Sequence, residues 1–408
     1  MTLAAVRRAE AALLLPTYDR QPVLFRRGSG CTLYDATGRR YLDFLSGIGV
    51  NALGYGHPAI RRALGQQAGR LIHVSNLFYH DYQAALARRL KKISGLDRVF
   101  FTNSGTEAIE GALKLARAYA RLHSPNGHRP RWRILALENS FHGRTFAALA
   151  ATGQRKYRAP FAPLVPGVRF VRFNNLRDLE RKFDSTVSAV LLEPIQGEGG
   201  IHPVSPEFFA RARALTRRAN ALLIADEIQC GLGRTGRYFA YQGYGIQPDV
   251  VTVAKPLAAG LPLGAILARE RVALAFHPGI HGTTFGGGPL ACAVALEFLE
   301  TLERERLLAR VRRLGAYFRA RLEELRTKYD WIREVRGAGL MLALELEFPG
   351  KAIVREALAR GVILNCTHDT VLRFLPPYII QERDVDQVVR TLGAIFARVD
   401  AERRSEKK

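Results

Sequence analysis

Short apolar stretches alternate with helical stretches from about residue 58 to residue 290, and this alternation constrains the fold more than any other feature of the chain. Apolar runs of four to eight residues bounded by turn residues are typical of buried strands. Strands that alternate with helices form a mainly parallel sheet covered by helices on both faces. We therefore predict an α/β fold with the strands RVFFT, RILAL, VRFVRF, AVLLEP, ALLIAD, DVVTVA and GAILA.

The two flanks of this region have a different pattern. Residues 22–45 alternate in polarity between glycine turns, which predicts antiparallel strands. After residue 289 the pattern predicts two long helices, at 289–308 and 309–328, and then a smaller α+β region. That region contains strand-like LMLALELE and VLRFL, with helices near 350–360 and from about 383. We predict an N-terminal segment (1–55) that joins the small domain, a large domain (56–290) and a C-terminal small domain (291–408).

The 408 residues carry a formal net charge of +24, which raises the question of nucleic-acid binding. The basic residues are spread along amphipathic helical stretches such as ALARRLKK, so we interpret them as solvated helix faces. No apolar run is long enough to span a membrane, and the four cysteines lie far apart without a C-x-x-C pair. We expect a cytoplasmic protein without a metal site and without nucleic-acid or membrane partners.

The segment LLIADEIQCGLGRTG (222–236) contains a G-x-G-x-x-G pattern, which is found in dinucleotide-binding turns. Such a turn requires the glycines directly between the strand and a helix. Here DEIQC separates the strand from the glycines, and the segment that follows is aromatic and interrupted by glycines. We therefore interpret the glycines as shaping a loop, and the acidic residues before them as the functional part.

Asp226 and Lys255 each follow an apolar strand, 29 residues apart, which is enough for one crossover between neighbouring parallel strands. A buried lysine loses its proton more easily than an exposed one, which suits a nucleophile that forms a Schiff base. Pyridoxal phosphate chemistry needs such a lysine and an acid that keeps the pyridine nitrogen protonated.

Three further segments contain groups that this cofactor and its substrates need. The turn at 103–106 opens a strong helix whose first N–H groups would bind phosphate, although Ser104 and Glu107 also read as an ordinary capping box. Phe141 could stack on a ring and Arg144 could bind a carboxylate. Glu193 and Glu198 follow another predicted strand.

Taken together, these motifs resemble those of the class III, fold-type I aminotransferases, which depend on pyridoxal phosphate. The resemblance covers nearly the whole chain, and within the class it is greatest to the enzymes that act on N2-acetylornithine. The segments that carry it are YLDFLSGIGVNALGYGHPAI, HVSNLFY, FFTNSGTEAIEGALKLAR, FHGRTFAALAATGQ, LEPIQGEGG, DEIQCGLGRTG, TVAKPLAAGLPLGA, HGTTFGGGPLACAVA and VLRFLPP.

The resemblance implies roles at matching positions. Lys255 would bond to the cofactor and shuttle a proton, Asp226 would pair with the pyridinium nitrogen, and Gln229 would lie near the ring hydroxyl. Ile228 and Phe141 would enclose the ring. The remaining cofactor contacts that it implies are Ser104, Gly105, Thr106, His142 and, from the other subunit, Thr284. It also implies substrate contacts at Tyr18, Arg144, Glu198, Thr283 and Arg373.

The shared Thr284 implies a homodimer. The implied reaction moves the terminal amino group of N2-acetylornithine to 2-oxoglutarate, by a ping-pong mechanism in arginine biosynthesis. Glu198 would pair with Arg373 during one half-reaction and release it for the 2-oxo acid in the other. Alternative substrates are ornithine, succinylornithine, acylated or carrier-linked lysine and 4-aminobutyrate. A pyridoxal phosphate aminomutase of the same fold is an alternative of another class. Non-enzymatic alternatives are a basic nucleic-acid-binding protein or a regulator built on a degenerate aminotransferase domain.

Overall fold

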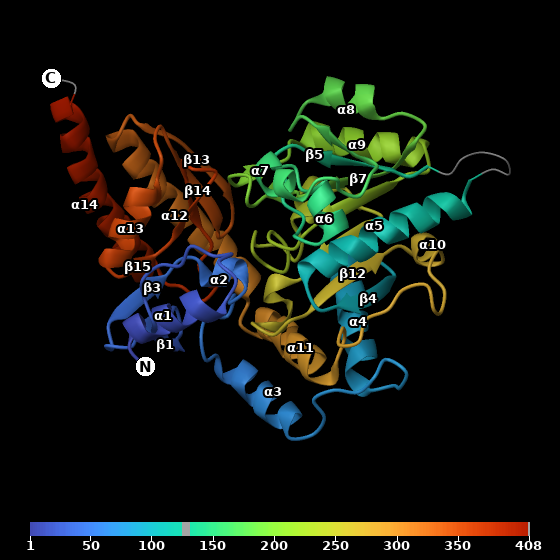
Figure 1. Cartoon of the computed structure of the whole chain (residues 1–408), viewed down its shortest axis with the longest axis horizontal. Helices are drawn as coiled ribbons and strands as arrows, with labels where there is room; N and C mark the ends of the chain where they lie inside the picture. The colour runs from blue at the N-terminus through green and yellow to red at the C-terminus, as the bar shows by residue number, and fades with distance from the viewer. Residues whose placement is uncertain (125–130, 407–408) are drawn as a thin grey trace.

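The computed structural model describes residues 1–124 and 131–406 and contains two lobes (Figure 1). The larger lobe is built on a seven-stranded sheet with the strand order β4-β12-β11-β10-β7-β5-β6. Every neighbouring pair is parallel except the two pairs that include β12. The strands are β4 (Arg98–Thr102), β5 (Arg133–Leu137), β6 (Val168–Val171), β7 (Val187–Leu192), β10 (Leu222–Asp226), β11 (Val250–Val253) and β12 (Gly264–Ala268).

Successive side chains of these strands enter two separate cores, because side chains alternate between the faces of a sheet. Leu222 and Ile224 of β10 pack with α5 (Gly105–Leu122) on one face. Leu223 and Ala225 belong to the larger core on the other face. The helices that contribute to that larger core include α3 (Pro58–Ala68), α4 (Asp81–Ser94), α9 (Pro206–Arg218) and α11 (Pro289–Arg304). Shorter helices of this lobe are α6 (Phe146–Ala151), α7 (Arg155–Arg158), α8 (Leu176–Lys182) and α10 (Glu270–Ala273).

The smaller lobe combines both ends of the chain. β3 (Arg40–Asp43) pairs in parallel with β15 (Val362–Ile363), so the N-terminal strands β1 (Phe25–Ser29) and β2 (Thr32–Asp35) share a sheet with a C-terminal one. A second sheet has the order β13-β14-β17-β16. Its strands are β13 (Ile332–Ala338), β14 (Met341–Leu346), β16 (Asn365–Thr367) and β17 (Val371–Phe374). The helices are α1 (Leu3–Leu13), α2 (Ser46–Gly49), α12 (Leu307–Lys328), α13 (Lys351–Ala359) and α14 (Glu382–Glu406).

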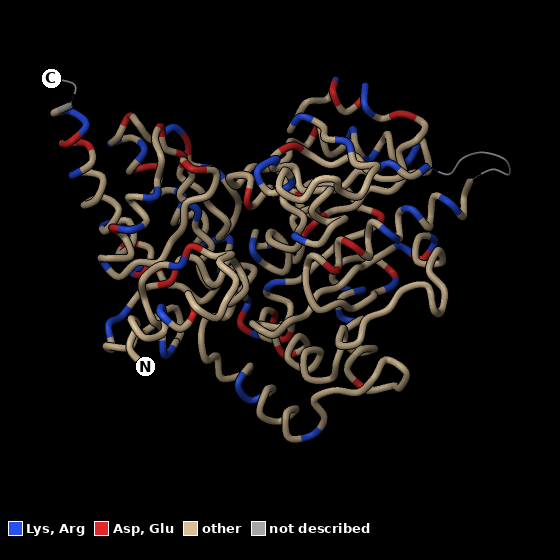
Figure 2. Tube along the Cα trace, viewed as in Figure 1, with Lys and Arg blue, Asp and Glu red and all other residues tan. Residues whose placement is uncertain are grey.

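The mixed α/β architecture agrees with the sequence-based prediction, while the domain boundaries near residues 55 and 290 stay a prediction. Lys and Arg occur throughout both lobes in Figure 2, interspersed with Asp and Glu. Within the described part of the chain, no helix has the length and apolarity that a membrane span requires. The glycines of 231–236 lie in a turn region after β10, as predicted, and Gly233 adopts a φ of +103° that favours glycine.

Candidate active site

A cavity of about 370 Å³ lies at the carboxyl ends of β7, β10 and β11. Open α/β sheets bind ligands at this edge. Asp226 is the last residue of β10, and Lys255 follows the end of β11 by two residues. Most of the predicted site residues line this cavity: Ser104, Gly105, Thr106, Phe141, His142, Arg144, Glu198, Asp226, Ile228, Gln229 and Lys255.

Asp226 is buried, and three donors fix its carboxylate. His142 Nδ1 lies 2.7 Å from Oδ2. The Ile228 N–H and the Thr252 hydroxyl donate to Oδ1 over 3.1 and 3.3 Å. Because three donors from separate segments hold one carboxylate, its orientation is set before any ligand binds. His142 Nε2 is buried and has no partner among the described residues.

Lys255 combines burial with an unusual backbone. Burial lowers the pKa of its amine below the ordinary 10.5, and the nearby carboxylates of Glu198 and Asp226 only partly oppose this effect. Its φ is +39°, in the left-handed region that side chains other than glycine rarely adopt. Such a conformation costs of order 1–3 kcal/mol and persists only where the surroundings impose it. Here Lys255 is held between the end of β11 and Pro256, and it lines the cavity.

The N-terminus of α5 lies on the same cavity. Ser104 is the N-cap, and its hydroxyl accepts from the Glu107 N–H over 3.3 Å, as the capping-box pattern predicted. The Glu107 carboxylate accepts from the Asn103 N–H over 2.7 Å, one residue earlier than a standard box. The first N–H groups of a helix have no partner within the helix, so those of Gly105 and Thr106 can bind an anion. A Cβ on Gly105 would lie 2.9 Å from Ile228 Cδ1, so this turn and the segment after β10 are tightly packed.

Hydrogen bonds tie the loop before α6 to the start of α5 and to the segment after β7. Thr106 Oγ1 accepts from the Arg144 N–H over 3.2 Å, and Glu193 accepts from the Phe141 N–H over 2.9 Å. The Arg144 guanidinium lies 4.0 Å from the ring centroid of Tyr157 and 5.4 Å from that of Phe141. These contacts leave the Arg144 guanidinium hydrogen-bond donors available at the cavity while its position is fixed by the rings.

Arg373 enters from β17 of the smaller lobe and is fully buried. Its Nη1 donates to Glu198 over 2.5 Å and to Gln229 Oε1 over 3.3 Å, and its Nη2 has no partner among the described residues. Burial by itself would raise the pKa of Glu198, but the charge and hydrogen bond of Arg373 hold it below its usual value. Glu198 lines the cavity and Arg373 does not, so the carboxylate stands between the arginine and the cavity.

Besides Arg373, three predicted residues lie outside this cavity within one chain, namely Tyr18, Thr283 and Thr284. The Tyr18 side chain is 76% exposed in the N-terminal segment, where Arg20 lies 5.5 Å from its ring centroid. Thr284 is exposed. Thr283 accepts from the Asn103 side chain over 3.0 Å and so lies next to the cavity wall.

The sequence predicted no individual role for five residues of the cavity wall: Val50, Asn103, Ala254, Leu261 and Leu263. For Glu193, which also lines the cavity, the sequence indicated only a position after a strand. Burial raises the pKa of the Glu193 carboxyl to about 7. Its oxygens accept from the backbone N–H groups of Phe141 and Gly197, each over 2.9 Å. Glu193 could have been predicted as a site residue because it is a charged residue at the end of a strand. The apolar wall residues could not, because their sequence pattern is the same as that of core residues.

The chain is similar to known proteins over nearly its whole length. The family model described as "Aminotransferase class-III" matches residues 15–396. The acetylornithine aminotransferase of Methanocaldococcus jannaschii is 46% identical over 94% of this chain and 96% of its own length. That of Aquifex aeolicus is also 46% identical, over 94% of this chain and 99% of its own length.

Two solved structures extend the comparison. The ornithine aminotransferase of Toxoplasma gondii ME49 superposes with a TM-score of 0.92 at 35% identity, covering 98% of this chain and 96% of that one. The acetylornithine aminotransferase of Elizabethkingia anophelis superposes with a TM-score of 0.85 at 31% identity, covering 96% of this chain and 98% of that one.

Proposed function

Because the chain belongs to the class-III aminotransferases, a family of pyridoxal phosphate enzymes, we propose that it transfers the terminal amino group of N2-acetylornithine to 2-oxoglutarate. The products are N-acetylglutamate semialdehyde and glutamate, as in arginine biosynthesis. The observation that carries the substrate assignment is the 46% identity to acetylornithine aminotransferases over nearly the full length of both chains. The place of action that we propose is the cytoplasm.

The residues of the cavity fit pyridoxal phosphate. Lys255 presents a buried amine of lowered pKa, and Asp226 is a buried carboxylate held in one orientation. The open N–H groups at the start of α5 suit the phosphate. When bound, the cofactor supplies an aldehyde that takes up an amine and a protonated ring that withdraws electrons from the reacting carbon. Phe141 and Ile228 would enclose the ring, with Gln229, His142 and Ser104 as further polar neighbours.

Each charged residue then has a definite task. Asp226 would hold the proton on the ring nitrogen by charge pairing, and His142 keeps that carboxylate in place. Lys255 Nζ would take the proton from the substrate carbon that bears the amino group and would pass it to C4′ of the cofactor. A lowered pKa serves this step because a base must be unprotonated to accept the proton.

Two chemically different substrates must use one site in turn. Arg144 would bind the substrate carboxylate, with Tyr18 assisting. While Arg373 and Glu198 form their ion pair, their charges cancel at the cavity wall. This neutral wall suits the uncharged or terminal-amine end of a substrate. When Glu198 moves away, Arg373 would bind a carboxylate of 2-oxoglutarate or glutamate bidentately. The Arg373–Glu198 pair is the feature that supports this two-state site.

We further propose that the enzyme is a homodimer with shared sites. Large apolar side chains are exposed on the segment after α3, including Leu77 (86%), Phe78 (65%) and Tyr79, and Phe285 (66%) is exposed beside Thr284. Contiguous exposed apolar residues of this kind mark protein–protein contacts. A second copy of the chain seated there would bring Thr284, and with it a hydroxyl, to the phosphate end of the neighbouring site.

Steady-state kinetics test the substrate. The ratio kcat/KM for N2-acetylornithine, ornithine, succinylornithine, N-acylated lysine and 4-aminobutyrate is measured with 2-oxoglutarate as acceptor. We expect N2-acetylornithine to have the highest kcat/KM. A clear preference for 4-aminobutyrate or free ornithine would overturn the assignment, and turnover without any 2-oxo acid would indicate an aminomutase.

A further inference from the structure

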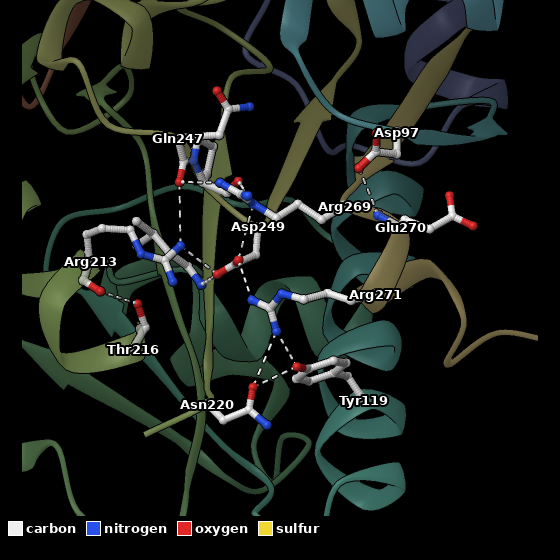
Figure 3. Close-up of polar contacts among 12 residues, drawn as sticks. Asp97, Tyr119, Arg213, Thr216, Asn220, Gln247, Asp249, Arg269, Glu270 and Arg271 are labelled. Atoms are coloured by element: carbon white, nitrogen blue, oxygen red, sulfur yellow. Dashed lines mark hydrogen bonds and ion pairs between the residues drawn. The ribbon is translucent and has the colours of Figure 1, made fainter. Parts of the chain in front are cut away.

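A second polar pocket lies at the opposite edge of the large sheet, where β10 and β11 begin (Figure 3). Four arginines and one aspartate form it: Arg213, Arg217, Arg269, Arg271 and Asp249. We call it the arginine pocket, and its volume is about 230 Å³. We propose that the arginine pocket binds a phosphate group, either as the free ion or as part of a small phosphate ester.

Asp249 cannot neutralise this pocket. The carboxylate is buried, and Arg213 and Arg271 donate to it over 2.7 and 2.6 Å. It also accepts from the Leu223 N–H over 2.9 Å and lies 3.5 Å from Arg269 Nε. A carboxylate has about four acceptor sites, so its capacity is used within the fold.

The guanidinium groups keep unused donors around the cavity. The Arg217 guanidinium forms no hydrogen bond or ion pair with any described residue, and Arg213 Nε is buried without a partner. Arg269 Nε donates to the Pro248 carbonyl over 3.2 Å, and Arg271 Nη1 donates to Tyr119 and Asn220. Glu270, next in the chain to Arg269, is occupied by a bidentate pair with Arg98, both bonds being 2.7 Å. Four positive groups thus face one acid, and a buried donor without an acceptor costs about 1–3 kcal/mol.

Arginine clusters select oxyanions, because the planar guanidinium matches two oxygens of a phosphate at once. The cavity has room for a tetrahedral ion with several waters, given that a water occupies about 30 Å³ in the liquid. Asn220 lines the same cavity, and its side-chain amide adds a neutral donor, whereas the Thr216 hydroxyl donates to the Ala212 carbonyl over 2.9 Å. The cavity that contains Lys255 is a separate site, since Asp249 precedes the start of β11 and Lys255 follows its end.

Calorimetric titration of inorganic phosphate into the holoenzyme tests the proposal, because bound pyridoxal phosphate already fills the phosphate site at α5. Ionic strength is held constant with chloride, and glycerol 3-phosphate is titrated in parallel to distinguish ester from free ion. The test variant is Arg217→Gln, and the matched control is Arg218→Gln, which removes the same charge from the neighbouring exposed position outside the pocket.

We expect saturable binding of phosphate or its ester to the wild type and to Arg218→Gln. Arg217→Gln should weaken this binding by about tenfold, through loss of one charge-assisted hydrogen bond. Its melting temperature should stay at the wild-type value without phosphate, because the Arg217 guanidinium has no partner in the described part of the chain. Absence of saturable binding to the wild type, or equal binding by the two variants, would overturn the proposal.

Discussion

Lys255 shows how a single residue is prepared for chemistry by its surroundings. The side chain lies in the cavity wall, burial lowers its pKa, and its backbone is in a strained left-handed conformation. The sequence predicted the lysine because a charged residue at the end of an apolar strand is rare. It did not predict the strain, because no property of the sequence Ala-Lys-Pro specifies a positive φ.

The lowered pKa of Lys255 makes a prediction for the cofactor-free protein. Between that lowered pKa and the ordinary 10.5, the unfolded chain binds a proton at Lys255 that the folded chain does not. The free energy of unfolding therefore rises with pH across this window. Urea denaturation of cofactor-free wild type and Lys255→Met at several pH values should show this rise only in the wild type. A parallel pH dependence in both proteins would contradict the lowered pKa.

The predicted site residues separate into two groups at this scale. Asp226 ends β10, Lys255 follows β11 by two residues and Glu198 follows β7 by six. Each could be found as a charged residue near the end of a buried strand, because the sheet gathers such ends at one edge. Tyr18 and Thr284 rest on the resemblance alone, and a single chain does not bring them to the cavity. The arginine pocket was missed because Asp249, Arg217 and Arg269 come from separate segments and look like ordinary solvated charges in sequence.

Among the elements, helix α5 has a structural task and a binding task at the same end. Ser104 caps the helix, and the adjacent N–H groups face the cavity. Its hydrophobic stripe packs against alternate residues of β10, β11 and β12. Because the helix is fixed by this packing, its N-terminus holds its position at the cavity.

Replacing the cap should affect both tasks. Ser104→Ala should lower the free energy of unfolding by about 1 kcal/mol and weaken pyridoxal phosphate binding, because the start of α5 would fray. The matched control is Asn175→Ala at the start of α8, where Asn175 accepts from the Asp178 N–H over 2.9 Å far from the cavity. It should cost similar stability and leave cofactor affinity unchanged, as measured by fluorescence titration. Equal cofactor affinity in both variants would contradict this role.

The elements differed in how far sequence could predict them. Strand β10 is a fully buried apolar run, and the predicted ALLIAD exceeds it by one residue. Strand β7 begins and ends two residues before the predicted AVLLEP, because Ser188 interrupts the apolar pattern at its start. The direction of β12 could not be predicted, because an apolar run of five residues reads the same in a parallel or antiparallel pair. Helix α1 was missed, since it buries no residue and its apolar positions have no core to face.

The whole molecule joins two lobes around one cavity. Lys255 lines it from the larger lobe, and Arg373 of the smaller lobe pairs with the wall residue Glu198. The parallel pairing of β3 with β15 places both chain ends in that smaller lobe (Figure 1). The exposed apolar residues around Tyr79 and Phe285 lie on the larger lobe and form the surface that we assign to the second subunit.

That assignment makes a prediction about assembly. Phe285→Asp should shift the protein from dimer to monomer in light scattering and abolish transamination, because a charge at an apolar contact is costly to bury and Thr284 would leave the neighbouring site. Leu122→Asp, at an exposed apolar position at the end of α5, should remain dimeric and active. An active monomer, or an unchanged dimer of Phe285→Asp, would contradict the shared site.

The central claim is that Lys255 and Asp226 form a pyridoxal phosphate site for transamination, and absorbance spectroscopy of the purified protein tests it most directly. We predict a visible band from the lysine-bound cofactor that N2-acetylornithine removes and 2-oxoglutarate restores. Lys255→Ala should lack this band. A protein without it after incubation with pyridoxal phosphate, or an unchanged band in Lys255→Ala, would contradict the account.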